Sequence, residues 1–437
     1  MGARDIDIGA MARRAREVLT KYPLCDYCLG RLFAKAGLGL SNRERGFALK
    51  TAILLELINP GCKSLQEDLL ATLARNGGEP FTRAYKKLYG RDVSVERCYI
   101  CNNKLSEGYY DEMAGKVAEG LKRFEASSFL VGVRAPRDLL EREAELLAEV
   151  GFQLSESLKH EVRREVGKRV VSMGDYRVDF THPDVVALID LENDEVLFEV
   201  KPLYFRARYW KRGRNISHAV WLRPDGTKKY DLSIEEYVGE PLKELFEARR
   251  VVFHASGRED VDVRMLGSGR SAVIEISEPR VRNFDIELIN SVLSSDLLEV
   301  RVDSIASSSD VEHVKVVESR HDKVYRALVL CKEEPKANIK DVEETFRNRV
   351  VTQRTPTRVL RRKKDVVRRR VVHELKMREL ADNLYEVMVY CSSGLYVKEL
   401  LNCDQGRTSP CLGDALGCNL QVLELDVLST LASGKMI

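Results

Sequence analysis

The chain has 437 residues, of which 44% are hydrophobic and 32% are charged, and its formal net charge is +3. This length exceeds what one ordinary hydrophobic core holds, so two or three domains are expected. The sequence has no apolar run of about 18 residues or more, and its first residues are too charged for a secretory signal. We therefore expect a cytoplasmic protein without a membrane span.

In chain order, residues 1–105 are predicted to be helices that flank two cysteine hooks, and Ser41 and Glu44 have the spacing of a helix capping box. Residues 106–210 alternate helices and strands, which predicts an α+β module of the size of an RNA-binding domain. Its predicted elements are helices Tyr109–Phe124, Arg137–Val150 and Leu158–Val170, strand Ser128–Val133, and a hairpin of Val185–Leu191 with Val196–Val200.

A polar, glycine-containing stretch follows and predicts a linker, which we place at 211–249. In residues 250–437 strands prevail over helices, which indicates one large antiparallel or mixed sheet with helices packed on it. The fold class is therefore α+β. The expected strands are Val261–Met265, Ala272–Ile276, Val300–Val302, Tyr325–Cys331, Val366–Leu375 and Leu384–Tyr390, and the expected helices are Ile286–Leu293, Val342–Arg347 and Val397–Leu401.

Four of the ten cysteines form two C-x-x-C hooks. Two such hooks supply the four thiolates of a tetrahedral site, so we expect one structural zinc bound by Cys25, Cys28, Cys98 and Cys101. The alternative is two unrelated thiol pairs or a redox-active hook. The other six cysteines have no repeated spacing, and in an intracellular chain of this length we expect reduced thiols at Cys62, Cys331, Cys391, Cys403, Cys411 and Cys418.

Positive charge is concentrated in two stretches, Lys201–Arg214 and Arg358–Arg370. On a near-neutral chain, separated basic stretches favour a surface patch directed at one partner. Aromatic residues are interleaved with the arginines of the first stretch, which suits either stacking on unpaired bases or a half-buried strand, and composition leaves both interpretations open. The second stretch is denser, and we expect it to contact RNA.

The most unusual segment is Ser256–Gly267, where charged and apolar residues alternate as on an exposed strand edge. Three carboxylates lie there close to three arginines, of which the third, Arg270, comes just after the segment. This composition fits an ion-pair ladder, a magnesium site or a catalytic carboxylate held ionised, and it does not choose among them.

The segment GREDVDVRMLGSGR resembles the catalytic signature of the Pus-ten family of pseudouridine synthases. Further stretches match that family in order: the two cysteine hooks, EVGKRV, VDFTHPDVVALIDL, RNISHAVW, KVYRALV, TPTRVLRRK, GLYVKELLNCDQGRTSP and LELDVL. The resemblance implies a zinc-bearing, THUMP-containing N-terminal domain and a C-terminal pseudouridine synthase domain. It also implies that the chain isomerises T-loop uridines of tRNA, at positions 54 and 55 in tRNA numbering.

The resemblance assigns roles to single residues. Asp260, the third residue of an Arg-x-Asp triplet that begins at Arg258, is the expected nucleophile. Tyr325, Tyr396 and Lys398 match residues beside the substrate, with Lys398 pairing with the catalytic carboxylate and so favouring its ionised form. We expect substrate contacts from Arg258, Tyr325, Tyr396 and Lys398, no catalytic cofactor, and a monomer that binds the T-arm of tRNA.

Several alternatives stay open at this point. Asp262, one pleat from Asp260 on the expected strand, is the rival nucleophile. The chain departs from the family pattern at Ser271 and Ala272, where Pro-Phe is usual, and its LRPDGTKKYDL stretch predicts no second zinc. Other functional classes are a THUMP-type enzyme of tRNA methylation or thiolation, for which we find no nucleotide loop, and a non-catalytic RNA adaptor.

Overall fold

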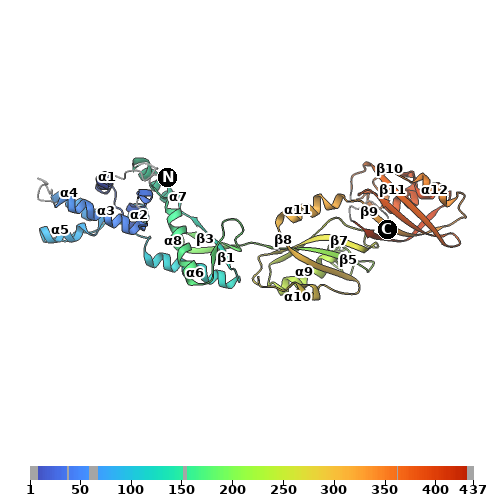
Figure 1. The fold of residues 1–437 in the computed structure, drawn as a ribbon, viewed down its shortest axis with the longest axis horizontal. Coiled ribbons are helices and arrows are strands. Elements are labelled where there is room, and N and C mark those ends of the chain that lie inside the picture. Colours follow the sequence, from blue (N-terminus) through green and yellow to red (C-terminus); the bar gives the residue numbers. More distant parts are fainter. Residues whose placement is uncertain (1–7, 37–38, 59–66, 151–154, 362, 431–437) are drawn as a thin grey trace. The chain divides into compact units, whose positions relative to one another are not determined.

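In a computed structural model of the protein, residues 8–36, 39–58, 67–150, 155–361 and 363–430 are described. The chain forms two compact units, Met1–Lys201 and Pro202–Ile437, and each has its own hydrophobic core. Figure 1 shows the helices and strands of both units. Within the described ranges, no helix is both long and apolar enough to cross a membrane.

The first unit begins with helices α1 (Ile8–Lys21), α2 (Asp26–Leu32), α3 (Asn42–Leu57), α4 (Glu67–Gly77) and α5 (Phe81–Tyr89). The predicted capping box starts α3, since Ser41 and Glu44 exchange side-chain and backbone hydrogen bonds. Helices α2 and α3 pack closely because two glycines face backbone: a Cβ at Gly30 would lie 1.7 Å from the Asn42 carbonyl oxygen. This contact fixes α2, the helix that Cys25 caps and that contains Cys28.

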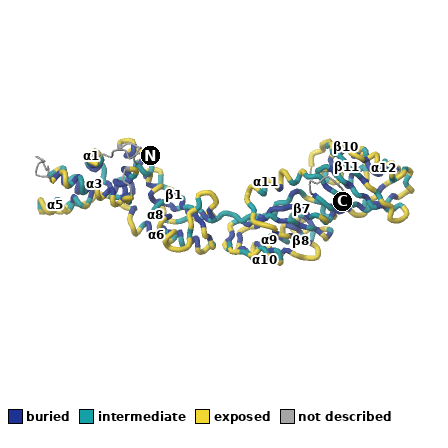
Figure 2. Tube along the Cα trace, viewed as in Figure 1, coloured by how far each residue is buried: buried dark blue, intermediate teal, exposed yellow. Residues whose placement is uncertain are grey.

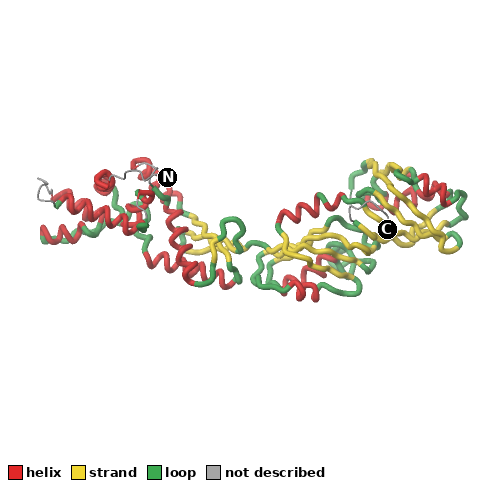
Figure 3. Tube along the Cα trace, in the orientation of Figure 1, coloured by secondary structure: helices red, strands yellow, loops and turns green. Residues whose placement is uncertain are grey.

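The rest of the first unit is a small sheet with helices, as predicted (Figure 3). Its strands have the order β2-β1-β3-β4; β1 runs parallel to β2 and β3, and the predicted hairpin is the antiparallel pair β3 and β4. The elements are α6 (Glu107–Arg123), β1 (Ser128–Arg134), α7 (Arg137–Val150), α8 (Leu158–Met173), β2 (Arg177–Val178), β3 (Val185–Asp190) and β4 (Glu195–Val200).

The second unit is built on one mixed sheet of ten strands, in the order β13-β10-β11-β12-β9-β14-β7-β5-β8, with β6 also paired to β7. The β14–β7 pair is parallel and its neighbours are antiparallel. The strands are β5 (Leu203–Lys211), β6 (Arg250–Ala255), β7 (Arg264–Ser277), β8 (Leu298–Ala306), β9 (Lys323–Cys331), β10 (Arg349–Arg354), β11 (Val367–Ala381), β12 (Leu384–Cys391), β13 (Thr408–Ser409) and β14 (Leu420–Ser429).

Helices α9 (Ile234–Leu245), α10 (Ile286–Val292), α11 (Ser308–Val316), α12 (Ile339–Thr345), α13 (Val397–Asn402) and α14 (Leu412–Leu416) accompany this sheet. Strand β7 is buried on both faces from 269 to 274, and β5, β6 and β14 all pair with it; Figure 2 colours each residue by its burial. The segment before β7, which carries Asp260, is therefore attached to a central strand of the sheet. The α+β fold class with a large mixed sheet is confirmed.

The compact units of the structure are bounded differently from the predicted domains. The division falls between Lys201 and Pro202 rather than at 210, and 106–201 shares one core with the helical region before it. The expected linker at 211–249 belongs to the second unit, since Lys211 ends β5 and helix α9 buries apolar side chains in that core. Alternate residues of β5 are buried, but the polar residues between them made this pattern hard to recognise in the sequence.

The prediction of reduced thiols was wrong for four of the six cysteines. Disulfides join Cys331 to Cys418 and Cys403 to Cys411, while Cys391 is a buried free thiol and Cys62 lies outside the described residues. The first pair follows from strand pairing that the sequence does not display: Cys331 is opposite Leu420, two residues after Cys418.

Candidate active site

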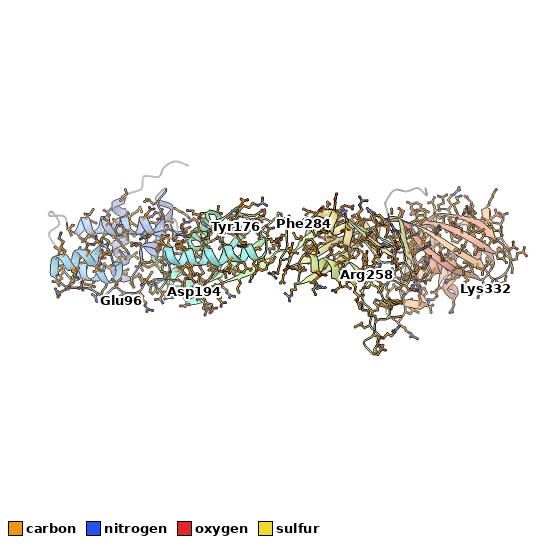
Figure 4. All side chains as sticks on the ribbon, turned by 90° about the horizontal axis from the view of Figure 1, so that it is seen from below. Glu96, Tyr176, Asp194, Arg258, Phe284 and Lys332 are labelled. Atoms are coloured by element: carbon orange, nitrogen blue, oxygen red, sulfur yellow. A yellow bond between two sulfur atoms is a disulfide. The ribbon has the colours of Figure 1, made fainter. Side chains whose placement is uncertain are left out.

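A cavity of about 460 Å³ opens in the second unit, next to the loop that connects β6 and β7. The five residues that the sequence singled out for catalysis and substrate binding all line it: Arg258, Asp260, Tyr325, Tyr396 and Lys398. Figure 4 labels Arg258 on this loop. The lining also carries further cations: Arg270, Lys323, Arg358, Lys363, Arg368 and Arg370. Such a cavity suits a polyanionic ligand.

Asp260 lies in a loop. The strand that was expected to begin at Val261 begins later in the chain. Strand β7 begins at Arg264, and a turn precedes it in which the Val263 N–H donates to the Asp260 carbonyl at 3.0 Å. Neither Asp260 nor Asp262 lies on the strand, so the two side chains do not share a strand face. The Asp260 side chain is 37% exposed and lines the cavity, whereas that of Asp262 is 61% exposed and is absent from the lining.

Two cations lie beside Asp260 and Asp262. Arg358 Nη1 lies 2.9 Å from Asp260 Oδ2, and Arg358 Nε donates to Glu399 Oε1 at 2.7 Å. Lys398 Nζ donates to both carboxylate oxygens of Asp262 at 2.7 Å and lies 3.5 Å from Asp260 Oδ2. Burial works against the charge of Arg358, but the hydrogen bond to Glu399 and the charges of Glu399 and Asp260 raise its pKa. Arg358 is thus the nearer cation to the expected nucleophile.

Sequence reasoning missed Arg358 and Glu399 as site residues. It placed Arg358 in a basic stretch expected to contact RNA, because charge density alone does not say which arginine turns inward. A usable signal was the position of Glu399 among apolar residues of α13, which are buried at Val397, Leu400 and Leu401. A carboxylate on such a buried face requires a cationic partner.

Glu259, next to Asp260, points into the protein, and its side chain is 1% exposed. It accepts a hydrogen bond from Tyr209 Oη at 3.0 Å and lies 3.3 Å from His218 Nε2 and 3.2 Å from Arg270 Nε. Burial by itself raises the pKa of Glu259, but the His218 hydrogen bond and the charges of Arg270, His218 and Lys211 outweigh it and lower the pKa. This carboxylate therefore stays ionised inside the protein.

The two expected tyrosines belong to different elements. Tyr325 lies on β9, and burial raises the pKa of its phenol, so the hydroxyl stays protonated. Tyr396 precedes α13, and its backbone N–H and carbonyl both bond the side-chain amide of Gln353 at 2.9 Å. Arg368 and Lys363 lie over the Tyr396 ring, at 5.6 and 5.9 Å from its centroid.

The aromatic and basic stretch on β5 forms a half-buried strand. Phe205 and Tyr209 are core residues, and Arg206 pairs with Asp310 of α11. These two aromatic side chains therefore pack in the core and do not face RNA. This agrees with the interpretation of the stretch as a half-buried strand.

In the first unit, the four cysteines of the hooks come together. Their sulfur atoms all lie within 4.8 Å of one another, with Cys25 Sγ 3.5 Å from Cys101 Sγ. Cys25 is the N-cap of α2, and the Cys28 N–H points to its sulfur at 3.4 Å. A cluster of four largely buried sulfurs is close enough to hold one metal ion, which fits the predicted donor set.

Comparison with known proteins agrees with the sequence resemblance. Residues 204–430 match the C-terminal domain of Pus10, and residues 113–190 match the archaeal THUMP domain of Pus10. A tRNA pseudouridine synthase Pus10 of Thermosphaera aggregans is 45% identical over 97% of both chains, and that of Ignisphaera aggregans is 41% identical over 95% of this chain and 97% of the relative. A solved Cbf5-Nop10-Gar1 complex is more distant, with 15% identity over 51% of this chain and 56% of that one and a TM-score of 0.26. The chain belongs to the Pus10 family, the Pus-ten family that its motifs resemble.

Proposed function

We propose that the protein is a tRNA pseudouridine synthase that isomerises T-loop uridines at positions 54 and 55 of tRNA, with Asp260 as its nucleophile. The observation that carries this proposal is the Asp260 carboxylate, which lines the cation-rich cavity and pairs with Arg358 at 2.9 Å. Membership of the Pus10 family, whose curated members are named tRNA pseudouridine synthases, supports the reaction and the substrate class.

The reaction needs one nucleophile and no redox chemistry. The bond between C1′ of the ribose and N1 of uracil breaks, the uracil turns, and a bond forms between C1′ and C5. N1 gains a proton and C5 loses one, so the product is an isomer of the substrate. An ionised carboxylate supplies the nucleophile, and Arg358 and Lys398 place positive charge 2.9 and 3.5 Å from Asp260 Oδ2.

The cavity side chains have distinct proposed roles. A uridine in a folded loop must leave its stack before it reaches Asp260, which costs a few kcal/mol. Stacking on Tyr325 offsets about 1–3 kcal/mol of that cost. Tyr396, under the cations Lys363 and Arg368, contacts the substrate next to the flipped base, and the exposed Arg258 contacts a phosphate.

The first unit has a supporting role in this proposal. We assign its cysteine cluster a zinc ion, because four cysteine sulfurs form a common closed structural zinc site. The metal would stabilise the helical region and take no part in the reaction. The THUMP domain at 113–190 would bind the same tRNA. A cytoplasmic monomer that binds the T-arm is the simplest form consistent with this substrate.

The test is pseudouridine formation on an unmodified tRNA transcript without added cofactor, mapped to single nucleotides. We expect product at positions 54 and 55. Transcripts that carry cytidine at either position serve as matched controls and should lose product at that position alone. Product elsewhere in the tRNA would refute the T-loop assignment, and binding without any product would favour an RNA adaptor.

A further inference from the structure

Three backbone carbonyls of the loop that carries Asp260 accept hydrogen bonds from residues 211–215, at the end of β5 and directly after it. Lys211 Nζ donates to the Asp260 carbonyl at 2.9 Å, the Asn215 N–H donates to that of Val261 at 3.0 Å, and Arg214 Nη1 donates to that of Asp262 at 2.6 Å. Three consecutive peptide carbonyls are thus bound from one short segment. Because peptide units are planar, fixing their carbonyls fixes the direction of the intervening side chains.

Lys211 is fully buried at the end of β5, with a side-chain exposure of 0%. Its ammonium also donates to the Ile216 carbonyl at 3.1 Å and lies 3.3 Å from that of Val261. The nearest carboxylate is that of Glu259, 3.7 Å away and itself buried. An apolar residue would fill this space at lower desolvation cost, so the buried charge is explained by the carbonyls it binds.

Arg214 repeats the arrangement on the other side of the loop. Besides the Asp262 carbonyl, its guanidinium donates to the Leu425 carbonyl at 3.1 Å and to Asp426 Oδ1 at 2.9 Å. Asp426 is 2% exposed and also accepts from Arg264 and Arg326, so Arg214 is tied to the centre of the sheet through β14. Lys211 and Arg214 therefore connect the loop to two different strands.

We propose that Lys211 and Arg214 are positioning residues for the reaction, which hold the backbone of residues 260–262 so that the Asp260 carboxylate meets the substrate. This inference rests on the proposed function, since it assigns Asp260 as the reacting group. A displacement of about 1 Å in a reacting group can cost on the order of 100-fold in rate. Glu259 has the complementary task of compensating the buried charge of Lys211.

The test compares Lys211→Met, Arg214→Met and Arg214→Lys with a matched control, Val387→Ala. Val387 is a fully buried residue of β12 that does not line the cavity, so its truncation lowers stability without touching the loop. Each variant is measured for melting temperature, tRNA affinity, single-turnover pseudouridine formation and hydrogen exchange of the peptide that covers 256–263. Exchange reports on the loop whether or not the reaction occurs.

We expect Lys211→Met to lose about 100-fold in single-turnover rate with tRNA affinity unchanged within about twofold, and to exchange faster at 256–263. Val387→Ala should keep its rate within about threefold at an equal loss of melting temperature. Arg214→Met should lose about tenfold, and Arg214→Lys, which retains a donor, should recover most of it. If Lys211→Met does not fold, the comparison of Arg214→Met with Arg214→Lys still tests the positioning role.

Rates that follow melting temperature across all four variants, with unchanged exchange at 256–263, would overturn the positioning role. So would a wild-type rate in both Lys211→Met and Arg214→Met. A wild-type protein that forms no pseudouridine would refute the proposed function instead, and the exchange data would still show whether these two cations hold the loop.

Discussion

The guanidinium of Arg358 lies 2.9 Å from Asp260 Oδ2, whereas the ammonium of Lys398 bonds Asp262 at 2.7 Å and lies 3.5 Å from Asp260. The motif in which Lys398 occurs implies that this lysine pairs with the nucleophile. In the structure, Arg358 is the closer partner, and Lys398 lies between the two aspartates. Arg358 also bonds Glu399, the residue after Lys398, so α13 orients both cations.

Removing the Arg358 charge is therefore predicted to affect the reaction more than removing that of Lys398. We expect Arg358→Met to lower the single-turnover rate about 100-fold, or roughly 2.7 kcal/mol, and Lys398→Met about tenfold, because the cation nearer to Asp260 interacts more strongly with its carboxylate. Arg378→Met on β11, which breaks a largely exposed pair with Glu386 of β12, is the control and should react normally. A larger loss in Lys398→Met would reverse this assignment.

Metal removal should act on the first unit. We expect one zinc per chain by elemental analysis, lost in Cys98→Ser and retained in Cys391→Ser, whose thiol is buried in the other unit. Loss of a structural zinc should lower the melting temperature of the first unit and weaken tRNA binding, because its folding energy depends on the metal. Wild-type protein without zinc, or zinc retained in Cys98→Ser, would contradict the site.

Lys323 predicts a pH dependence of stability. Burial, and then the charge of Arg270, lower the pKa of Lys323 to about 8 from 10.5. Between these values the unfolded chain binds more protons than the folded one. The free energy of unfolding therefore decreases as pH falls from 10.5 to 8, because protonation of Lys323 favours the unfolded chain. Relative to Lys323→Met, wild type should therefore gain up to about 3 kcal/mol as pH rises through this window.

Urea unfolding followed by tryptophan fluorescence measures this change in the second unit, because both tryptophans, Trp210 and Trp221, lie there. Taking the difference between wild type and Lys323→Met cancels the titration of other groups. A difference that stays constant from pH 8 to 10.5 would show that the pKa of Lys323 is not lowered.

The disulfides are predicted to stabilise the second unit by amounts that follow their loop lengths. The Cys331–Cys418 bridge spans 87 residues and the Cys403–Cys411 bridge spans 8. Chain-entropy arguments give about 4–5 kcal/mol for the first and about 2–3 kcal/mol for the second. Non-reducing peptide mapping should find both cross-linked peptides, and Cys331→Ser should destabilise more than Cys403→Ser. Four titratable thiols at these positions in native protein would contradict both bridges.

Much of the fold was predictable from local pattern. The strand at Ser128–Val133, the hairpin at 185–200 and the acidic helix at 137–150 follow from periodicity and turn residues, and the structure has all of them. The domain boundary was not predictable from local pattern, because β5 alternates buried apolar residues with arginines and looks like a basic surface stretch. The arginines are accounted for only when their partners, such as Asp310, are brought close by the sheet.

The candidate site shows the same division. The resemblance to the Pus-ten family implied that Asp260, Tyr325, Tyr396 and Lys398 would meet, and all four line the cavity. The roles of Arg358, Lys211 and Glu259 depend on side-chain direction and on contacts between residues far apart in sequence. A single sequence does not carry that information, since a charged residue in a basic stretch is compatible with both solvent and a buried partner.

Single-turnover pseudouridine formation by wild type, Asp260→Asn and Asp262→Asn on the same tRNA tests whether Asp260 is the nucleophile. Each variant must first match wild type in melting temperature and tRNA affinity. We predict product from wild type and Asp262→Asn, at a reduced rate in the latter, and none from Asp260→Asn. Product from Asp260→Asn together with none from Asp262→Asn would contradict the assignment and make Asp262 the nucleophile.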